Sequence, residues 1–126
     1  MAKTDKRRST ARLPAQITRA LRAVEDKKAT DIVVLDLRKA AGFTDFFVIC
    51  AGSNPRQIRA IADSVMAALA DEGTKPAHVE GYDRSEWVLL DYFDFIVHVF
   101  APETRVFYSL ERLWGNAERI EVAAGG

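Results

Sequence analysis

The chain is 126 residues long and carries 18 basic and 18 acidic side chains, so its formal net charge is zero. Hydrophobic residues make up 48% of the sequence, which supports one domain with a sizeable core and excludes a disordered chain. A zero net charge also argues against binding to bare nucleic acid through overall charge, because such domains are strongly basic.

Cysteine content and hydropathy narrow the class of protein further. Cys50 is the single cysteine, which excludes an internal disulfide framework and a cysteine-based zinc site and fits a reducing compartment. Its place within an apolar run predicts an inert, buried thiol. No apolar run reaches the roughly 18 residues of a membrane span, and the N-terminal residues lack the apolar core of a secretory signal. These features predict a cytoplasmic protein.

The first segment is basic, and a helix follows it. Residues 1–12 contain five basic side chains and one acidic side chain, a net charge of +4, and we expect residues 1–13 to form a basic, flexible arm. Pro14 then suits the start of an amphipathic helix, whose apolar stripe is formed at helical spacing by Ile17, Ala20, Leu21 and Val24. Such a stripe packs against the rest of a domain.

Two strands and a long helix come next. Residues 31–37 are apolar and β-branched, and residues 46–51 are continuously apolar, so both segments predict strands. The unbroken apolar run of the second strand indicates burial on both of its faces. Asn54 is a good N-cap and Pro55 suits the first helical position, which predicts a helix that ends near Gly73.

The remaining sequence predicts a short strand over 78–80, a hairpin of strands over 87–91 and 95–100, and one or two short helices over 103–114. This order of elements is typical of an α/β (α+β) domain with a mixed, five-stranded sheet covered by helices. We expect the domain to span residues 14–115 and residues 116–126 to form a C-terminal tail.

The hairpin separates its side chains onto two faces. With a two-residue loop of Tyr92 and Phe93, Asp91 lies opposite Asp94, an unfavourable pair of like charges that a cationic partner would offset. Because side chains alternate, one face carries Trp87, Leu89, Asp91, Asp94, Ile96 and His98. The other face is apolar and therefore buried, with Val88, Leu90, Phe95, Val97 and Val99. Neither histidine has a metal-ligating companion at a usable spacing, so we expect His98 to be packed and hydrogen-bonded.

The hairpin region is both aromatic and acidic. Trp87 with the nearby Tyr82 and Tyr92 has the composition of a binding hot spot, where Trp and Tyr are enriched. Over residues 75–100, two basic side chains oppose five acidic ones, a net charge of −3. An acidic surface with exposed aromatic rings suits a basic protein partner better than a phosphate backbone. A solvated turn and a core tryptophan are the alternative interpretations.

A catalytic interpretation also has to be considered. Gly52 and Ser53, between a strand and a helix, could hold a phosphate at the helix N-terminus. Asp91 and Asp94 could hold a divalent metal, and the combination suggests nucleotide transfer. A nucleotidyltransferase, however, needs an acidic pair soon after the Gly-Ser, and Asp63 stands alone on the following helix. The sequence contains no G-x-S-x-G, H-E-x-x-H or P-loop pattern.

Three blocks of sequence stand out in chain order. Residues 44–57 begin Thr-Asp-Phe-Phe-Val-Ile-Cys-Ala-Gly-Ser-Asn-Pro, residues 87–100 are Trp-Val-Leu-Leu-Asp-Tyr-Phe-Asp-Phe-Ile-Val-His-Val-Phe, and residues 108–114 are Tyr-Ser-Leu-Glu-Arg-Leu-Trp. Together they resemble the ribosomal silencing factor family (RsfS, Iojap-like), and the resemblance covers about residues 14–115. It implies a nucleotidyltransferase-like fold that lacks the catalytic carboxylates.

The resemblance also implies a function. Members of this family are non-enzymatic translation repressors that bind ribosomal protein number fourteen of the large subunit and block association with the small subunit. They often form a homodimer when free. Carried over by position, the partner-binding residues are Trp87, Leu90, Asp91, Tyr92 and Asp94. Strand alternation places Leu90 on the buried face, and many members have glycine where this chain has Phe93, which leaves the turn geometry open.

Two other functions stay open on the sequence alone. One is a divergent, magnesium-dependent nucleotidyltransferase with Gly52 and Ser53 at the phosphate and with Asp91 and Asp94 at the metal. The other is a homodimeric adaptor with a different protein target. Magnesium-dependent nucleotide binding would distinguish the first, and capture of a target other than the large subunit would distinguish the second.

Overall fold

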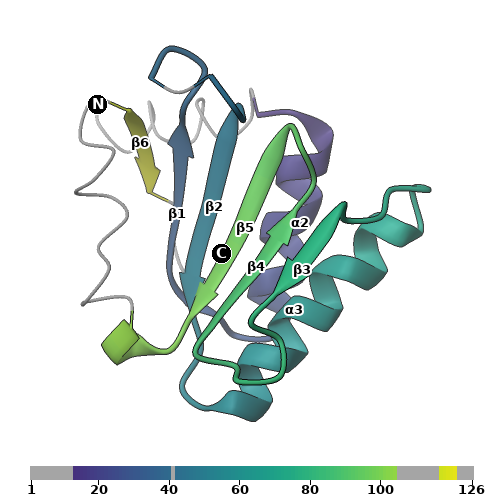
Figure 1. Cartoon of the computed structure of the whole chain (residues 1–126), viewed down its shortest axis with the longest axis vertical. Helices are drawn as coiled ribbons and strands as arrows, with labels where there is room; N and C mark the ends of the chain where they lie inside the picture. The colour runs from purple at the N-terminus through teal and green to yellow at the C-terminus, as the bar shows by residue number, and fades with distance from the viewer. Residues whose placement is uncertain (1–12, 41, 105–116, 122–126) are drawn as a thin grey trace.

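A computed structural model describes residues 13–40, 42–104 and 117–121 and shows a sheet with two helices packed on one face (Figure 1). The elements in chain order are α2 (Ala15–Asp26), β1 (Thr30–Asp36), β2 (Phe46–Ala51), α3 (Pro55–Ala70), β3 (His78–Glu80), β4 (Trp87–Asp91), β5 (Phe95–Phe100) and β6 (Glu118–Glu121). The strand order is β3-β4-β5-β2-β1-β6, in which β2 and β5 run parallel and the other neighbours antiparallel. The predicted fold class is confirmed, with six strands in place of five.

Both helices begin where the residue pattern predicts. α2 starts directly after Pro14 and buries the predicted apolar stripe. At the start of α3, the Asn54 side chain accepts a hydrogen bond of 2.8 Å from the Gln57 backbone N–H, which satisfies a donor that helix N-termini leave unpaired. Beyond α3, Gly73 has a φ of +79° and closes the helix. Among the described residues, no helix is long and apolar enough to cross a membrane.

The sheet is buried on both faces by different sets of side chains. On the face covered by α2 and α3, the helices pack on alternate strand residues such as Val48, Leu90 and Val97, which have no exposed surface. We call the opposite side of the sheet the second face; its buried cluster consists of Val33, Leu35, Leu37, Phe47, Ile49, Ile96 and Phe100. Every residue of β2 is buried, as its unbroken apolar run predicts, and Cys50 lies buried within it.

The C-terminal part of the sheet differs from the prediction. Glu118–Glu121 form β6, which pairs with β1 and adds Ile120 to the core beneath the helices. The sequence predicts a tail over 116–126 and not a strand. A four-residue strand with one apolar side chain carries almost no pattern from which it could be predicted. The helices predicted over 103–114 and the basic arm predicted over 1–13 lie for the most part outside the described residues.

The hairpin of β4 and β5 has a register shifted by two residues from the predicted one. Asp91 lies opposite Ile96, so the predicted pairing of Asp91 with Asp94 is wrong. The two-residue loop is Phe93–Asp94, and the Asp91 carboxylate holds it there by accepting the Phe93 N–H at 2.9 Å. Because the shift is an even number of residues, every strand side chain keeps its predicted face.

Candidate functional site

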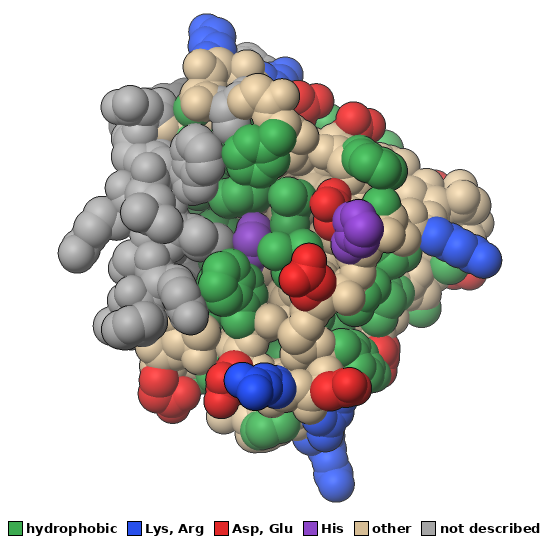
Figure 2. Space-filling view, viewed as in Figure 1, with side chains coloured by type: hydrophobic (Ala, Val, Ile, Leu, Met, Phe, Trp, Pro, Cys, Tyr) green, Lys and Arg blue, Asp and Glu red, His purple; other side chains and the backbone are tan. Residues whose placement is uncertain are grey.

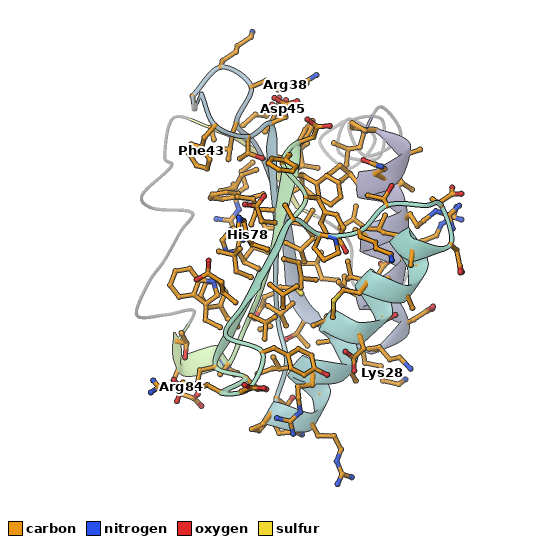
Figure 3. The ribbon with its side chains drawn as sticks, turned by 45° about the vertical axis from the view of Figure 1, so that its right-hand side comes forward. Lys28, Arg38, Phe43, Asp45, His78 and Arg84 are labelled. Carbon is orange, nitrogen blue, oxygen red and sulfur yellow. The ribbon has the colours of Figure 1, made fainter. Side chains whose placement is uncertain are left out.

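The second face is accessible where it reaches β3 and β4. Strand pairing sets His78 beside Asp91 and Glu80 beside Leu89 on this face, with Trp87 one row further along. His78 and Glu80 are exposed, and the other three are half-buried. Figure 2 views this face, with hydrophobic, acidic and histidine side chains next to one another, and in Figure 3 His78 points away from the helices. We call these five residues the β3–β4 surface.

Trp87 is fixed in place by a buried histidine. Its Nε1–H donates a hydrogen bond of 3.0 Å to Nδ1 of His98, and its ring stacks on Phe100 with 5.0 Å between the ring centroids. His98 is 3% exposed, and burial lowers its pKa to about 3, so the imidazole is neutral near pH 7 and can accept this bond. The prediction of a packed, hydrogen-bonded His98 is confirmed. The sequence places both residues on one face but gives no sign of the bond between them.

The hairpin turn extends the β3–β4 surface beyond the end of β4. The Phe93 N–H donates to the Asp91 carboxylate at 2.9 Å, and the Thr44 hydroxyl donates to the Phe93 carbonyl at 2.8 Å. A third bond of 2.9 Å runs from the Asp45 N–H to the Asp94 carbonyl. Phe93 and Asp94 are exposed at the tip. Thr44 is therefore a supporting residue of the turn that sequence reasoning did not single out.

Two of the five predicted partner-binding residues lie under the helices. Leu90 has no exposed surface and Tyr92 is 6% exposed, and both belong to the core on the helix side. The Tyr92 hydroxyl is buried without a hydrogen-bond partner among the described residues, and burial raises its pKa to about 12. Trp87, Asp91 and Asp94 keep accessible side chains on the second face or at the turn beside it.

The aromatic cluster predicted from Trp87, Tyr82 and Tyr92 is not formed. Tyr82 lies in the turn between β3 and β4 and packs toward the helices, where its hydroxyl bonds both carboxylate oxygens of Asp63, at 2.9 and 3.1 Å. Hydrogen bonding to Asp63 raises the pKa of Tyr82. Trp87 packs on the second face instead. The turn itself is tight, because a Cβ added to Gly81 would lie 2.0 Å from the Trp87 carbonyl oxygen.

The two halves of the alternative catalytic site lie at opposite ends of the sheet. Gly52 and Ser53 follow the C-terminal end of β2, whereas the turn with Asp91 and Asp94 lies beyond its N-terminal end. The length of β2 separates the two by roughly 17 Å. At the α3 N-terminus, the Ser53 N–H already donates to the Gln57 side chain at 2.6 Å. Within the part of the chain that the structure describes, no group of three or more His, Cys, Asp or Glu could hold a metal ion.

Comparison with known proteins identifies the family. A family model described as "Ribosomal silencing factor during starvation" matches residues 10–125. The ribosomal silencing factor RsfS of Halalkalibacterium halodurans is 40% identical over 103 residues, which make up 82% of this chain and 88% of that protein. The chloroplastic protein Iojap of Zea mays is 39% identical over 101 residues, 80% of this chain and 44% of that protein.

Solved structures agree on the fold. A crystal structure of a protein from Chromobacterium violaceum matches with a TM-score of 0.77 and 37% identity, and the match covers 79% of this chain and 83% of that one. A crystal structure from Bacillus halodurans matches with a TM-score of 0.74 and 37% identity, covering 84% and 96%. The chain belongs to the ribosomal silencing factor family, as the resemblance of its sequence blocks predicts.

Proposed function

We propose that this protein is a translation repressor that binds the large ribosomal subunit through ribosomal protein number fourteen and so blocks association with the small subunit. Membership of a family named for silencing ribosomes supports the proposal, as does an RsfS relative that is 40% identical. The proposed action is steric and needs no catalytic group, metal or cofactor.

The β3–β4 surface is the observation that carries this proposal. A half-exposed tryptophan, held by a hydrogen bond and a ring stack, is a typical anchor for a protein partner. Glu80, Asp91 and Asp94 place negative charge around Trp87 and along the adjoining turn. This charge favours a basic ribosomal protein as the partner and disfavours the phosphate backbone of RNA.

Leu90 and Tyr92 have a supporting role in the proposed docking. Both pack on the helix side of β4, next to strand residues whose side chains point to the second face. They therefore help to set the position of Trp87 and Asp91 without offering surface to the partner. The homodimer of the free protein stays a prediction, and sedimentation velocity of the purified chain measures it.

Co-sedimentation with purified large subunits tests the proposal. Trp87→Ala should weaken binding by about 2 kcal/mol or more, roughly thirtyfold, because it removes the anchor. Arg22→Ala, on the exposed side of α2, is the matched control and should bind like the wild type. Thermal melts establish that both variants are folded at the assay temperature.

A second measurement follows the consequence of binding. Small subunits added to the complex should join fewer large subunits than in the absence of the protein, and light scattering reports the joined ribosomes. Unchanged binding of Trp87→Ala would contradict the proposed surface. Failure of the wild-type protein to co-sediment, or unimpaired subunit joining in its presence, would contradict the proposed function.

A further inference from the structure

Phe93 combines an unfavourable backbone conformation with an exposed ring. Its φ is +70°, in the left-handed region that bulky side chains rarely occupy. Phe93 is 71% exposed, more than any other large hydrophobic residue that the structure describes. Both features are unfavourable for the isolated protein. The ring is not buried in the core, so no gain from burial offsets them.

The turn around Phe93 is nevertheless held firmly. The Asp91 carboxylate accepts its N–H at 2.9 Å, and the Thr44 hydroxyl donates to its carbonyl at 2.8 Å. Backbone strain persists where the surroundings over-determine it, and such residues concentrate at functional sites. A firmly held turn also fixes the backbone from which the ring projects, so little backbone freedom is lost when a partner binds.

The other non-glycine residues with positive φ have reasons within the fold. Lys28 follows the end of α2, where a left-handed residue commonly closes a helix. Asp31 belongs to a residue type that tolerates this conformation. Ser85 is buried, and its hydroxyl accepts a hydrogen bond of 3.1 Å from the Arg59 guanidinium. At Phe93 the two-residue hairpin loop accounts for the positive φ, because the first position of such a loop requires it. The loop does not account for a bulky, exposed ring at a position that suits glycine, and this ring points to a role outside the protein.

We infer that Phe93 is an apolar anchor of the docking surface that inserts into an apolar recess with a basic rim on the protein partner. This inference rests on the proposed function. Asp94 and Asp45 are exposed at the same turn and would face the rim. The nearby Arg38, visible beside Asp45 in Figure 3, is already paired with Asp36 at 2.6 Å. RNA is a poorer occupant, because its phosphates would face the carboxylates.

The test replaces Phe93 with residues that suit its backbone conformation. Phe93→Gly and Phe93→Asn both remove the ring and relieve the strain. Both should bind purified large subunits at least about tenfold more weakly than the wild type. Their melting temperatures should stay equal or rise by about 2–5 °C. Val79→Ala shortens another exposed apolar side chain, on the helix side of β3, and should change neither quantity.

The outcomes separate this inference from its alternatives. Lower melting temperatures with unchanged affinity of the folded variants would indicate a structural role and overturn the inference. Unchanged affinity with unchanged stability would overturn it as well, while co-sedimentation of the wild type would still uphold the proposed function. No co-sedimentation of the wild type would overturn both. A loss of affinity reproduced on protein-free ribosomal RNA would overturn the assignment to a protein partner.

Discussion

His98 links folding stability to pH through a single side chain. Burial lowers its pKa to about 3, from the ordinary histidine value of 6.5 that applies in the unfolded chain. Because the folded-state pKa is depressed, the unfolded chain takes up a proton first as the pH falls. The contribution to stability is therefore fully present above about pH 7 and decreases as the pH falls through 6.5 toward 3.

We expect a change from pH 7.5 to pH 5.0 to lower the free energy of unfolding by about 2 kcal/mol through His98 alone. His98→Asn keeps an acceptor for the Trp87 Nε1–H but cannot titrate, so it should lose this part of the pH dependence. Urea unfolding at both pH values measures the difference. Asp36 does not contribute to this difference. Hydrogen bonding to Arg38 lowers its pKa below 3.8, so its carboxylate is ionised at both pH values. An equal pH dependence in both proteins would exclude His98 as its source.

The turn between β3 and β4 sets a steric limit beside Trp87. Gly81 has a φ of +76°, and a Cβ there would lie 2.0 Å from the Trp87 backbone oxygen. Gly81→Ala should therefore lower the free energy of unfolding by about 3 kcal/mol and weaken docking, because β4 must shift.

Gly73 provides the matched control for this prediction. Its φ is +79°, but nothing lies within 4 Å of an added Cβ, so Gly73→Ala carries the backbone strain without the clash. We expect it to cost about 1 kcal/mol. Thermal unfolding compares the two variants, and equal losses would mean that the contact with the Trp87 carbonyl is not what excludes a side chain from Gly81.

Most elements follow from the sequence because each depends on a local pattern. The cap at Asn54 and the stop at Gly73 are decided by residues within a few positions. The register of the hairpin is not local, because alternation along a strand is satisfied equally well by a shift of two residues. The actual pairing depends on the Asp91 carboxylate at the Phe93 N–H and on Thr44, which comes from 49 positions away.

The same shift determines where the Tyr92 side chain lies. A loop that begins at Tyr92 removes this residue from the alternation, and the family resemblance then places it on the partner surface. The loop begins one residue later, so Tyr92 continues the alternation of β4 to the helix side, where its ring stacks on Phe95 at 4.9 Å. Trp87 lies well inside the strand, where either register gives it the same face.

At the scale of the whole molecule, zero net charge is the sum of two opposite parts. Residues 1–12 carry +4, so the remaining residues carry −4, and −3 of this lies between residues 75 and 100. Asp91 and Asp94 lie at the hairpin turn, and Asp45 is joined to it through a hydrogen bond from its backbone N–H to the Asp94 carbonyl. The local field at this turn, and not the total charge, should therefore govern association with a basic partner.

Two substitutions raise the net charge equally, from 0 to +2, and so distinguish the effect of the local field on association from the effect of the total charge. Asp94→Lys acts at the hairpin turn, whereas Asp26→Lys acts at the end of α2, near the opposite end of the sheet. Asp94→Lys should slow association with large subunits by about tenfold at low salt, and Asp26→Lys by less than about twofold. Stopped-flow association of labelled protein measures both rates.

Measuring the same association rates at higher ionic strength extends this comparison. Exposed charges are screened beyond about 10 Å at 0.1 M salt, so added salt should slow the wild type and Asp26→Lys but leave Asp94→Lys nearly unchanged. If both variants associate faster than the wild type, attraction of a more basic protein to ribosomal RNA governs the encounter. That result would contradict docking through an acidic turn. A basic partner that docks there should be slowed by the substitution at the turn and hardly affected by the one at the end of α2.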